Sequence, residues 1–88
     1  MAQWQDKVAV ITGAGSGIGA GLAGHAISRG MTVYAADVDE AGLARLASEL
    51  DSERLFCAVL DVSRGDQLAN LAERVFREEA GRSEPAVQ

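Results

Sequence analysis

The sequence predicts an α/β fold, a three-layer arrangement in which a parallel sheet of three strands lies between helices in the order β-α-β-α-β-α. Apolar runs rich in β-branched residues alternate with segments of helical period, and a glycine-rich stretch joins the first run to the first helical segment. Strands that alternate with helices of about 10–15 residues are connected by right-handed crossovers into a parallel sheet. The 88 residues suffice for one small domain at most.

The first strand is predicted at residues 7–13, KVAVITG, because a continuous apolar run that ends at a glycine is typical of a parallel strand buried on both faces. From Gly17 the apolar residues follow a helical period, and the helix is expected to stop at Gly30. One apolar stripe of this helix is expected to face the sheet: Ile18, Leu22, Ala26 and Ile27.

The second strand is predicted at residues 32–37, TVYAAD, which end at an acid. Asp39 can cap the following helix, because a carboxylate oxygen accepts hydrogen bonds from the first N–H groups of a helix. The apolar stripe of that helix comprises Leu43, Leu46, Ala47 and Leu50. A third buried strand is predicted at residues 54–61, RLFCAVLD, and it also ends at an aspartate.

Ser63 can cap a third helix, and Gly81 is expected to close it. The apolar stripe of this helix comprises Leu68, Leu71, Ala72, Val75 and Phe76. Residues 1–82 are therefore predicted to form one half-domain, and residues 83–88 a polar tail that holds the only proline.

Composition and charge limit the classes of function. Hydrophobic residues make up 48% of the chain, an ordinary proportion for a soluble globular protein. The net charge of −5, without a cluster of basic residues, argues against a nucleic-acid partner. Cys57 is the only cysteine, which excludes an internal disulfide and a cysteine-based metal site and fits a reducing cytoplasm. Since no apolar stretch approaches the ~18 residues of a membrane span, we expect a cytoplasmic protein without a membrane partner.

The glycine-rich stretch GAGSGIG at residues 13–19 suits the binding of a phosphate group. The start of a helix presents unpaired backbone N–H groups and about half a unit of positive charge. In a strand–turn–helix of this kind Gly13 can make the tight turn, Gly17 can let a pyrophosphate approach the backbone, and Gly19 can let the helix pack closely on the strand. A P-loop is set aside, because no Gly-Lys-Ser/Thr follows the turn.

Asp37 ends the second strand eighteen positions after Gly19, close to the spacing of about 20 residues expected of a ribose-binding acid. Its carboxylate can accept hydrogen bonds from both ribose hydroxyls and repels a 2′-phosphate, and neither Ser16 nor Val38 supplies a positive charge to offset that repulsion. The sequence thus predicts a Rossmann-type dinucleotide site that prefers NAD to NADP. In the alternative interpretation the glycines only pack an α/β turn and Asp37 only ends a strand.

The stretch TGAGSGIG at residues 12–19 resembles the short-chain dehydrogenase/reductase family, whose pattern is Thr-Gly-x-x-x-Gly-x-Gly. The lead-in DKVAVITG, Asp37 and the pair Asp61–Val62 are also similar to the family, and the resemblance extends over residues 6 to about 81. It implies hydride transfer between NAD and an alcohol or carbonyl substrate, with the Asp61 side chain and the following backbone against the adenine. The candidate cofactor-binding residues are Gly13, Gly15, Ser16, Gly17, Ile18, Gly19, Asp37, Val38, Asp61 and Val62.

The resemblance stops after Gly81. Family members continue into a fourth strand with an Asn-Asn-Ala-Gly motif, and later supply a catalytic Ser, a Tyr-x-x-x-Lys pair and a further Asn. Tyr34 is the only tyrosine of this chain, and Val38 stands where the lysine would be needed, so no catalytic residue is nominated. The sequence predicts a truncated, NAD-binding half-domain of an NAD-dependent oxidoreductase that is not catalytic alone.

The alternative function is that of a non-catalytic nucleotide-binding or interaction module. In the family the first strand pairs with both the second and the fourth strand, so without a fourth strand VAVIT at residues 8–12 is expected to form an exposed apolar edge. Such an edge is open to pairing with another chain. We therefore expect self-association, or pairing with a separate catalytic portion, through the first strand.

Overall fold

The computed structural model describes residues 7–61 and 63–82 of the chain. Strands and helices alternate in the predicted order, which confirms the α/β class: β1 (Val8–Thr12), α1 (Gly17–Ser28), β2 (Thr32–Asp37), α2 (Glu40–Leu50), β3 (Leu55–Val59) and α3 (Gly65–Arg82). The predicted tail at residues 83–88 lies outside the described residues.

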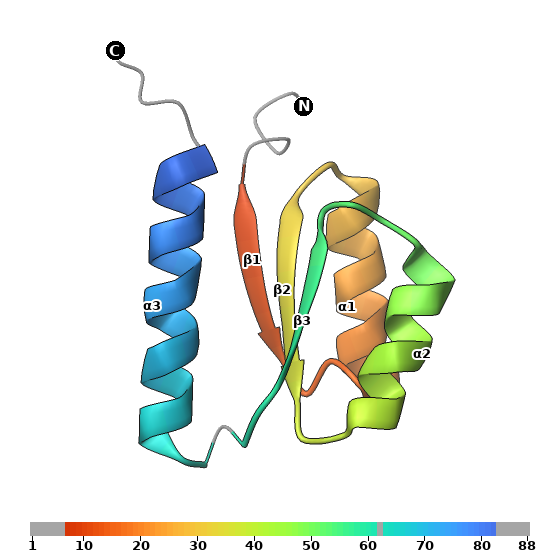
Figure 1. The fold of residues 1–88 in the computed structure, drawn as a ribbon. Helices are drawn as coiled ribbons and strands as arrows, with labels where there is room; N and C mark the ends of the chain where they lie inside the picture. Colours follow the sequence, from red (N-terminus) through yellow and green to blue (C-terminus); the bar gives the residue numbers. More distant parts are fainter. Residues whose placement is uncertain (1–6, 62, 83–88) are drawn as a thin grey trace.

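The three strands form one parallel sheet in the order β1-β2-β3, with Tyr34 of β2 in register with Val10 of β1 and Phe56 of β3. Helices α1 and α2 cover one face of this sheet and α3 lies on the other, which gives the expected three layers (Figure 1). Within the described residues, none of the helices is long and apolar enough to cross a membrane.

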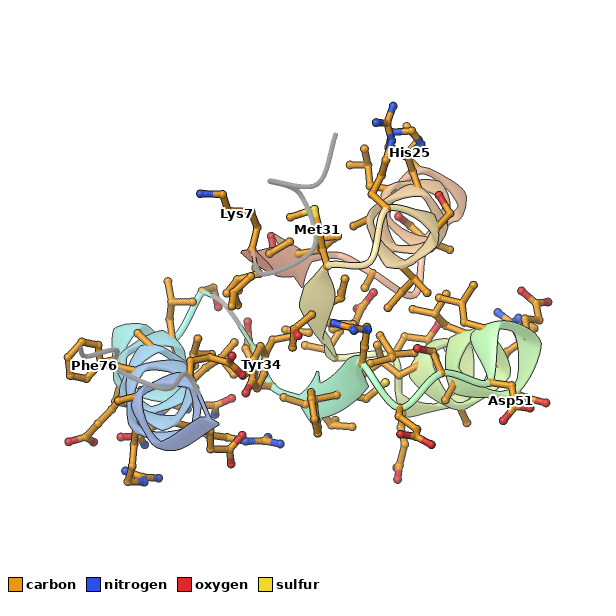
Figure 2. The ribbon with its side chains drawn as sticks, turned by 90° about the horizontal axis from the view of Figure 1, so that it is seen from above. Lys7, His25, Met31, Tyr34, Asp51 and Phe76 are labelled. Atoms are coloured by element: carbon orange, nitrogen blue, oxygen red, sulfur yellow. The ribbon has the colours of Figure 1, made fainter. Side chains whose placement is uncertain are left out.

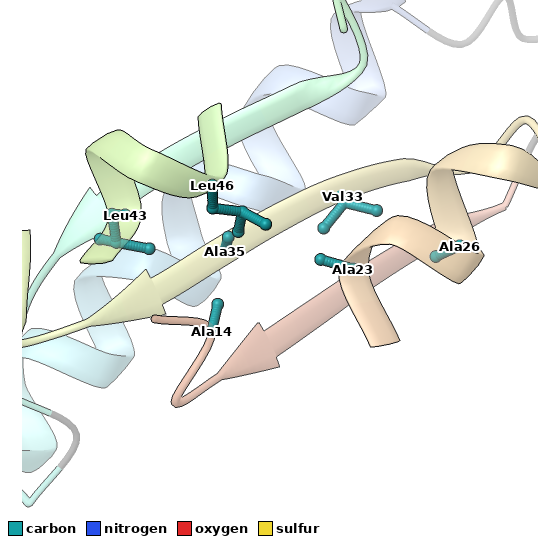
Figure 3. Packing of buried hydrophobic residues seen from close by; sticks show 7 residues of the cluster. All are labelled: Ala14, Ala23, Ala26, Val33, Ala35, Leu43 and Leu46. Atoms are coloured by element: carbon teal, nitrogen blue, oxygen red, sulfur yellow. The ribbon is translucent and has the colours of Figure 1, made fainter. Parts of the chain in front are cut away.

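The core lies between β2 and the pair α1 and α2 (Figure 3). Its buried residues are mostly small: Ala14, Ala23, Ala26, Val33, Ala35, Leu43 and Leu46. The alanines of this core come from the turn, α1 and β2, whereas α2 contributes the two leucines.

The apolar run of the first strand predicts burial on both faces, but the structure does not show this. The third strand is only partly buried. Val10 is 48% exposed, and the exposed and partly buried residues of β1 alternate along the strand. The reason is the order of the sheet, in which β2 lies in the centre and is buried while β1 and β3 form the edges of the described sheet. An apolar residue at an edge keeps its side chain in solvent unless another element covers it.

Helix α1 is rotated relative to the predicted apolar stripe, of which Ala26 is buried and Ile27 is partly buried against the core. Its buried residues are Gly19, Ala23 and Ala26, while Ile18 is 82% exposed and Leu22 is 57% exposed. The face that meets the sheet is the one with the smallest side chains. The expected end of the helix is confirmed, since α1 stops at Ser28 and Gly30 takes a positive φ of 82°.

Helix α2 begins as predicted, because the Asp39 side chain accepts a hydrogen bond from the Gly42 N–H at 3.0 Å. Leu43 and Leu46 of the predicted stripe are buried, and Leu50 is partly buried against the core. Ala47 is exposed, so the buried face is narrower than the apolar pattern suggests.

Helix α3 differs most from its prediction. Ser63 does not cap it, because its hydroxyl and its N–H both donate to the Asp61 carboxylate, and Gly81 lies inside the helix rather than after it. Leu71 is buried, whereas Phe76 is 78% exposed. Figure 2 shows Tyr34 on the side of the sheet that α3 covers and Phe76 on the part of α3 that points away from it. Leu68 and Ala72 of the predicted stripe are also exposed, and Val75 is partly buried.

Candidate functional site

The glycine-rich stretch forms a tight turn between β1 and α1. Gly13 takes a φ of +67°, in the left-handed region that favours glycine, and so makes the expected turn. The next residue, Ala14, is fully buried, and its N–H donates to the Ala36 carbonyl of β2 at 3.1 Å. The turn is therefore tied to the carboxyl end of the central strand.

Ser16 caps the start of α1. Its hydroxyl accepts a hydrogen bond from the Gly19 N–H at 3.2 Å and donates to the Gly13 carbonyl at 2.7 Å. The N–H groups of Gly17 and Ile18 have no hydrogen-bond acceptor within the described part of the chain. Since these amides lie at the positive end of the helix dipole, this corner can accept an anion.

Gly19 allows the helix to lie directly on the turn. A Cβ atom built on Gly19 would lie 2.8 Å from the Cα of Ala14 and would also meet the Gly13 backbone. Gly17 is different, because a Cβ atom there would meet nothing within 4 Å. The expected close packing of α1 on the turn is thus present at Gly19, whereas the space beside Gly17 is open to a ligand.

Asp37 lies beside this turn. Its Oδ2 accepts a hydrogen bond from the Gly15 N–H at 2.8 Å, and its Oδ1 accepts one from the Asp39 N–H at 3.1 Å. These hydrogen bonds, that from Asp39 first, hold the pKa of the Asp37 carboxyl below its ordinary value. The carboxylate is therefore ionised at neutral pH and fixed against the glycine-rich turn. Val38, the next residue, is exposed.

Asp61 follows β3 at the same edge of the sheet. The Leu60 N–H donates to the Asp37 carbonyl at 3.0 Å, so the chain after β3 stays beside the end of β2. The Asp61 carboxylate accepts hydrogen bonds from the side chain and the backbone of Ser63, which lower its pKa. Val62, predicted to contribute its backbone, lies outside the described residues.

The structure thus brings the described candidate residues to one edge of the sheet, at the carboxyl ends of all three strands (Figure 1). In open α/β sheets ligands bind at this edge. Gln67 also lies at this edge, because its side-chain carbonyl accepts a hydrogen bond from the Asp61 N–H at 2.7 Å. A glutamine in the first turn of a polar helix carries no pattern that would single it out.

The profile of the family described as short chain dehydrogenase matches residues 7–82. The chain belongs to this family. The match covers all six elements of the fold, from the residue before β1 to the last residue of α3. It also includes the turn at residues 13–19 and the acids that end β2 and follow β3.

Several oxidoreductases of known sequence or structure resemble this chain over most of its length. An uncharacterised oxidoreductase of Staphylococcus saprophyticus is 35% identical over 77 residues, which are 84% of this chain and 33% of the relative. A short-chain dehydrogenase/reductase of Burkholderia phymatum, solved in complex with NAD, is 43% identical with a TM-score of 0.77, over 84% of this chain and 27% of that one. A 3-ketoacyl-(acyl-carrier-protein) reductase of Brucella melitensis, complexed with NADH, is 34% identical with a TM-score of 0.76, over 84% of this chain and 30% of that one.

The chain therefore spans about a third or less of the length of these relatives. The segment that the family profile matches contains the glycine-rich turn, Asp37 and Asp61. These relatives support a nicotinamide dinucleotide as the cofactor class of this fold, because two of the solved structures hold NAD or NADH.

Proposed function

We propose that this segment of a short-chain dehydrogenase binds the adenosine and diphosphate part of NAD, and that it prefers NAD to NADP. The observation that carries the proposal is the Asp37 carboxylate, held by two backbone N–H groups beside the amino-terminal end of α1. The diphosphate lies against the N–H groups of Gly17 and Ile18, and the adenosine ribose donates its hydroxyls to Asp37.

The preference for NAD follows from the charge of Asp37. Its lowered pKa keeps the carboxylate ionised at neutral pH. A 2′-phosphate would bring a second negative charge to the same place, and like charges at close range repel. Ser16 and Val38, the residues placed to offset this repulsion, are both neutral.

We further propose that this segment supplies the cofactor half of an oxidoreductase site and no proton donor for the reaction. Tyr34, the only tyrosine of the chain, is buried, and its hydroxyl donates to carboxylates of α3 rather than to the edge that carries Asp37. A nicotinamide carries the hydride, but the carbonyl or alcohol substrate also needs a group that moves its proton. We place that group outside these 88 residues.

Calorimetric titration of the purified chain with NAD, NADP and ADP-ribose tests the cofactor proposal. We expect weak binding, NAD preferred over NADP, and ADP-ribose bound about as well as NAD because the nicotinamide makes few contacts with this segment. In Asp37→Ala the preference for NAD should disappear, while the diphosphate contacts remain. Equal or tighter binding of NADP by the wild-type chain would overturn the role of Asp37.

A second function, association through the edge of the sheet, is favoured by the exposure of β1. Val8 and Val10 are both exposed on one face of this strand, and on the other face an apolar hollow of about 270 Å³ is lined by residues of β1 and α1, among them Ile11 and Leu22. We propose that a second copy of the chain pairs with this edge, since unpaired strand edges template such contacts. Sedimentation velocity should show concentration-dependent dimers that Val10→Lys abolishes, and a monodisperse monomer at all concentrations would contradict this function.

A further inference from the structure

A contact between two glycines joins α2 to the glycine-rich turn. A Cβ atom built on Gly42 would lie 3.1 Å from the Cα of Gly15, and one built on Gly15 would lie 3.4 Å from the Cα of Gly42. Gly42 is buried in the first turn of α2. The two backbones thus meet with room for little more than hydrogen atoms.

Each of these glycines also holds an aspartate. The Gly15 N–H donates to Asp37 Oδ2 at 2.8 Å, and the Gly42 N–H donates to Asp39 Oδ1 at 3.0 Å. The Asp39 N–H in turn donates to Asp37 Oδ1 at 3.1 Å. The four residues therefore form a closed ring of contacts, in which Asp37 is held from one side by the turn and from the other by the start of α2.

Side chains on either glycine would disturb this ring. A Cβ atom on Gly42 would lie 2.7 Å from Asp39 Oδ2, and one on Gly15 would lie 2.8 Å from Asp37 Oδ2. Both distances are shorter than carbon and oxygen atoms tolerate without contact strain. Because Asp39 is fixed as the cap of α2 and Gly15 is fixed in the turn, an added methyl group would push α2 away from the turn and move the Asp37 carboxylate.

We propose that Gly42 is a positioning residue for ribose recognition: its contact with Gly15 sets the separation between α2 and the turn at which Asp37 is oriented toward the 2′-hydroxyl. This inference rests on the proposed binding of the adenosine ribose by Asp37. The two backbone hydrogen bonds use one acceptor site on each carboxylate oxygen, and a carboxylate offers about four. Each oxygen therefore retains capacity for one ribose hydroxyl, provided that the plane of the carboxylate is held.

The test compares ADP with 2′-deoxy-ADP, which differ only in the hydroxyl that Asp37 is expected to accept. Calorimetric titrations use the full chain as wild type, Gly42→Ala, and Gly21→Ala as the matched control. Gly21 lies within α1, where a Cβ atom would meet nothing within 4 Å. A global loss of stability would weaken both ligands alike, so the ratio of the two affinities isolates the orientation of the carboxylate.

We expect the wild-type chain and Gly21→Ala to bind ADP about tenfold more tightly than 2′-deoxy-ADP, as for a lost hydrogen bond to a charged group. In Gly42→Ala this ratio should fall to about two or less, while the affinity for 2′-deoxy-ADP changes by less than about threefold. A wild-type ratio in Gly42→Ala would overturn this inference and leave the proposed function intact. Failure of the wild-type chain to bind ADP, or to distinguish it from 2′-deoxy-ADP, would overturn both.

A measurement on the wild-type chain keeps the inference testable if Gly42→Ala does not fold. The amide resonances of Gly15 and Gly42 are expected to shift together in nuclear magnetic resonance spectra when ADP is added, and to shift less with 2′-deoxy-ADP. The Gly21 amide serves as the control, and its resonance should not distinguish ADP from 2′-deoxy-ADP. A Gly42 resonance that ignores the 2′-hydroxyl while Gly15 responds to it would refute the coupling between the two.

Discussion

Replacement of Tyr34 by phenylalanine removes one hydroxyl from the contact between β2 and α3. The Tyr34 residue is 1% exposed, and its hydroxyl lies 2.7 Å from Glu79 Oε2 and 3.0 Å from Glu78 Oε1. A phenol has a single proton, so it donates one hydrogen bond at a time to these carboxylates. The ring itself stacks on Phe56 with centroids 5.2 Å apart. Tyr34→Phe keeps this stacking and the contact of the ring with the Arg74 guanidinium, and it removes the hydrogen bond of the hydroxyl.

The size of the effect follows from the kind of hydrogen bond. A hydrogen bond to a charged acceptor contributes about 1.5–3 kcal/mol to the free energy of unfolding. Partial exposure of the two carboxylates reduces this contribution to about 1–2 kcal/mol. In a domain of this size about 1 kcal/mol corresponds to roughly 4–8 °C in Tm. We therefore expect Tyr34→Phe to lower Tm by about 5–15 °C. Amide exchange should accelerate more in α3 than in α2, because α3 loses a hydrogen bond to the sheet.

Circular dichroism melts and amide hydrogen exchange measure the two parts of this prediction. Glu73→Gln is the control, because this glutamate lies on the exposed side of α3 and its loss should leave Tm unchanged. A Tm for Tyr34→Phe within about 2 °C of the wild-type value, with equal exchange rates in α3, would refute the reasoning. In that case apolar contacts such as that of Leu71 would suffice to hold α3.

Three further predictions concern the turn, the site carboxylate and the core. Gly19→Ala places a Cβ atom 2.8 Å from the Cα of Ala14, so we expect a loss of about 1–3 kcal/mol in urea denaturation together with weaker binding of NAD; unchanged values would contradict the close contact. Because the pKa of Asp37 is lowered on folding, its contribution to stability is present above the ordinary pKa and is lost as the pH falls through the lowered one. Unfolding free energies measured from pH 7 downward should therefore decline below about pH 4, and less steeply in Asp37→Asn; parallel profiles would exclude this linkage. Leu46→Ala, at a residue 3% exposed, should cost about 2–5 kcal/mol, whereas Leu22→Ala, at a residue 57% exposed, should cost less than about 0.5 kcal/mol; equal losses would show that the two sites are equally buried.

Features that depend on neighbouring residues in the chain could be predicted from the sequence. The alternation of strands and helices, the cap at Asp39 and the end of α1 at Gly30 each follow from a few adjacent residues, and the structure confirms them. The apolar pattern alone could not predict the burial of the strands, because Val10 is equally apolar in the centre of a sheet and at its edge. The exposed edge at β1 was expected only from the family resemblance. The contact of Gly42 with the turn was likewise invisible, since it depends on where α2 crosses the sheet.

The rotation of α1 connects the site to one of the failures of hydrophobic periodicity. A helix ordinarily turns its largest apolar residues toward the core, which would bury Ile18 and Leu22. Here the start of the helix must lie directly on the turn, and only Gly19 can face the Ala14 backbone at that distance. Once Gly19 faces inward, the helical period also brings Ala23 and Ala26 inward and carries Ile18 and Leu22 out into solvent. The geometry that leaves two amides open to an anion therefore sets the orientation of the whole helix, at the expense of apolar burial on its other side.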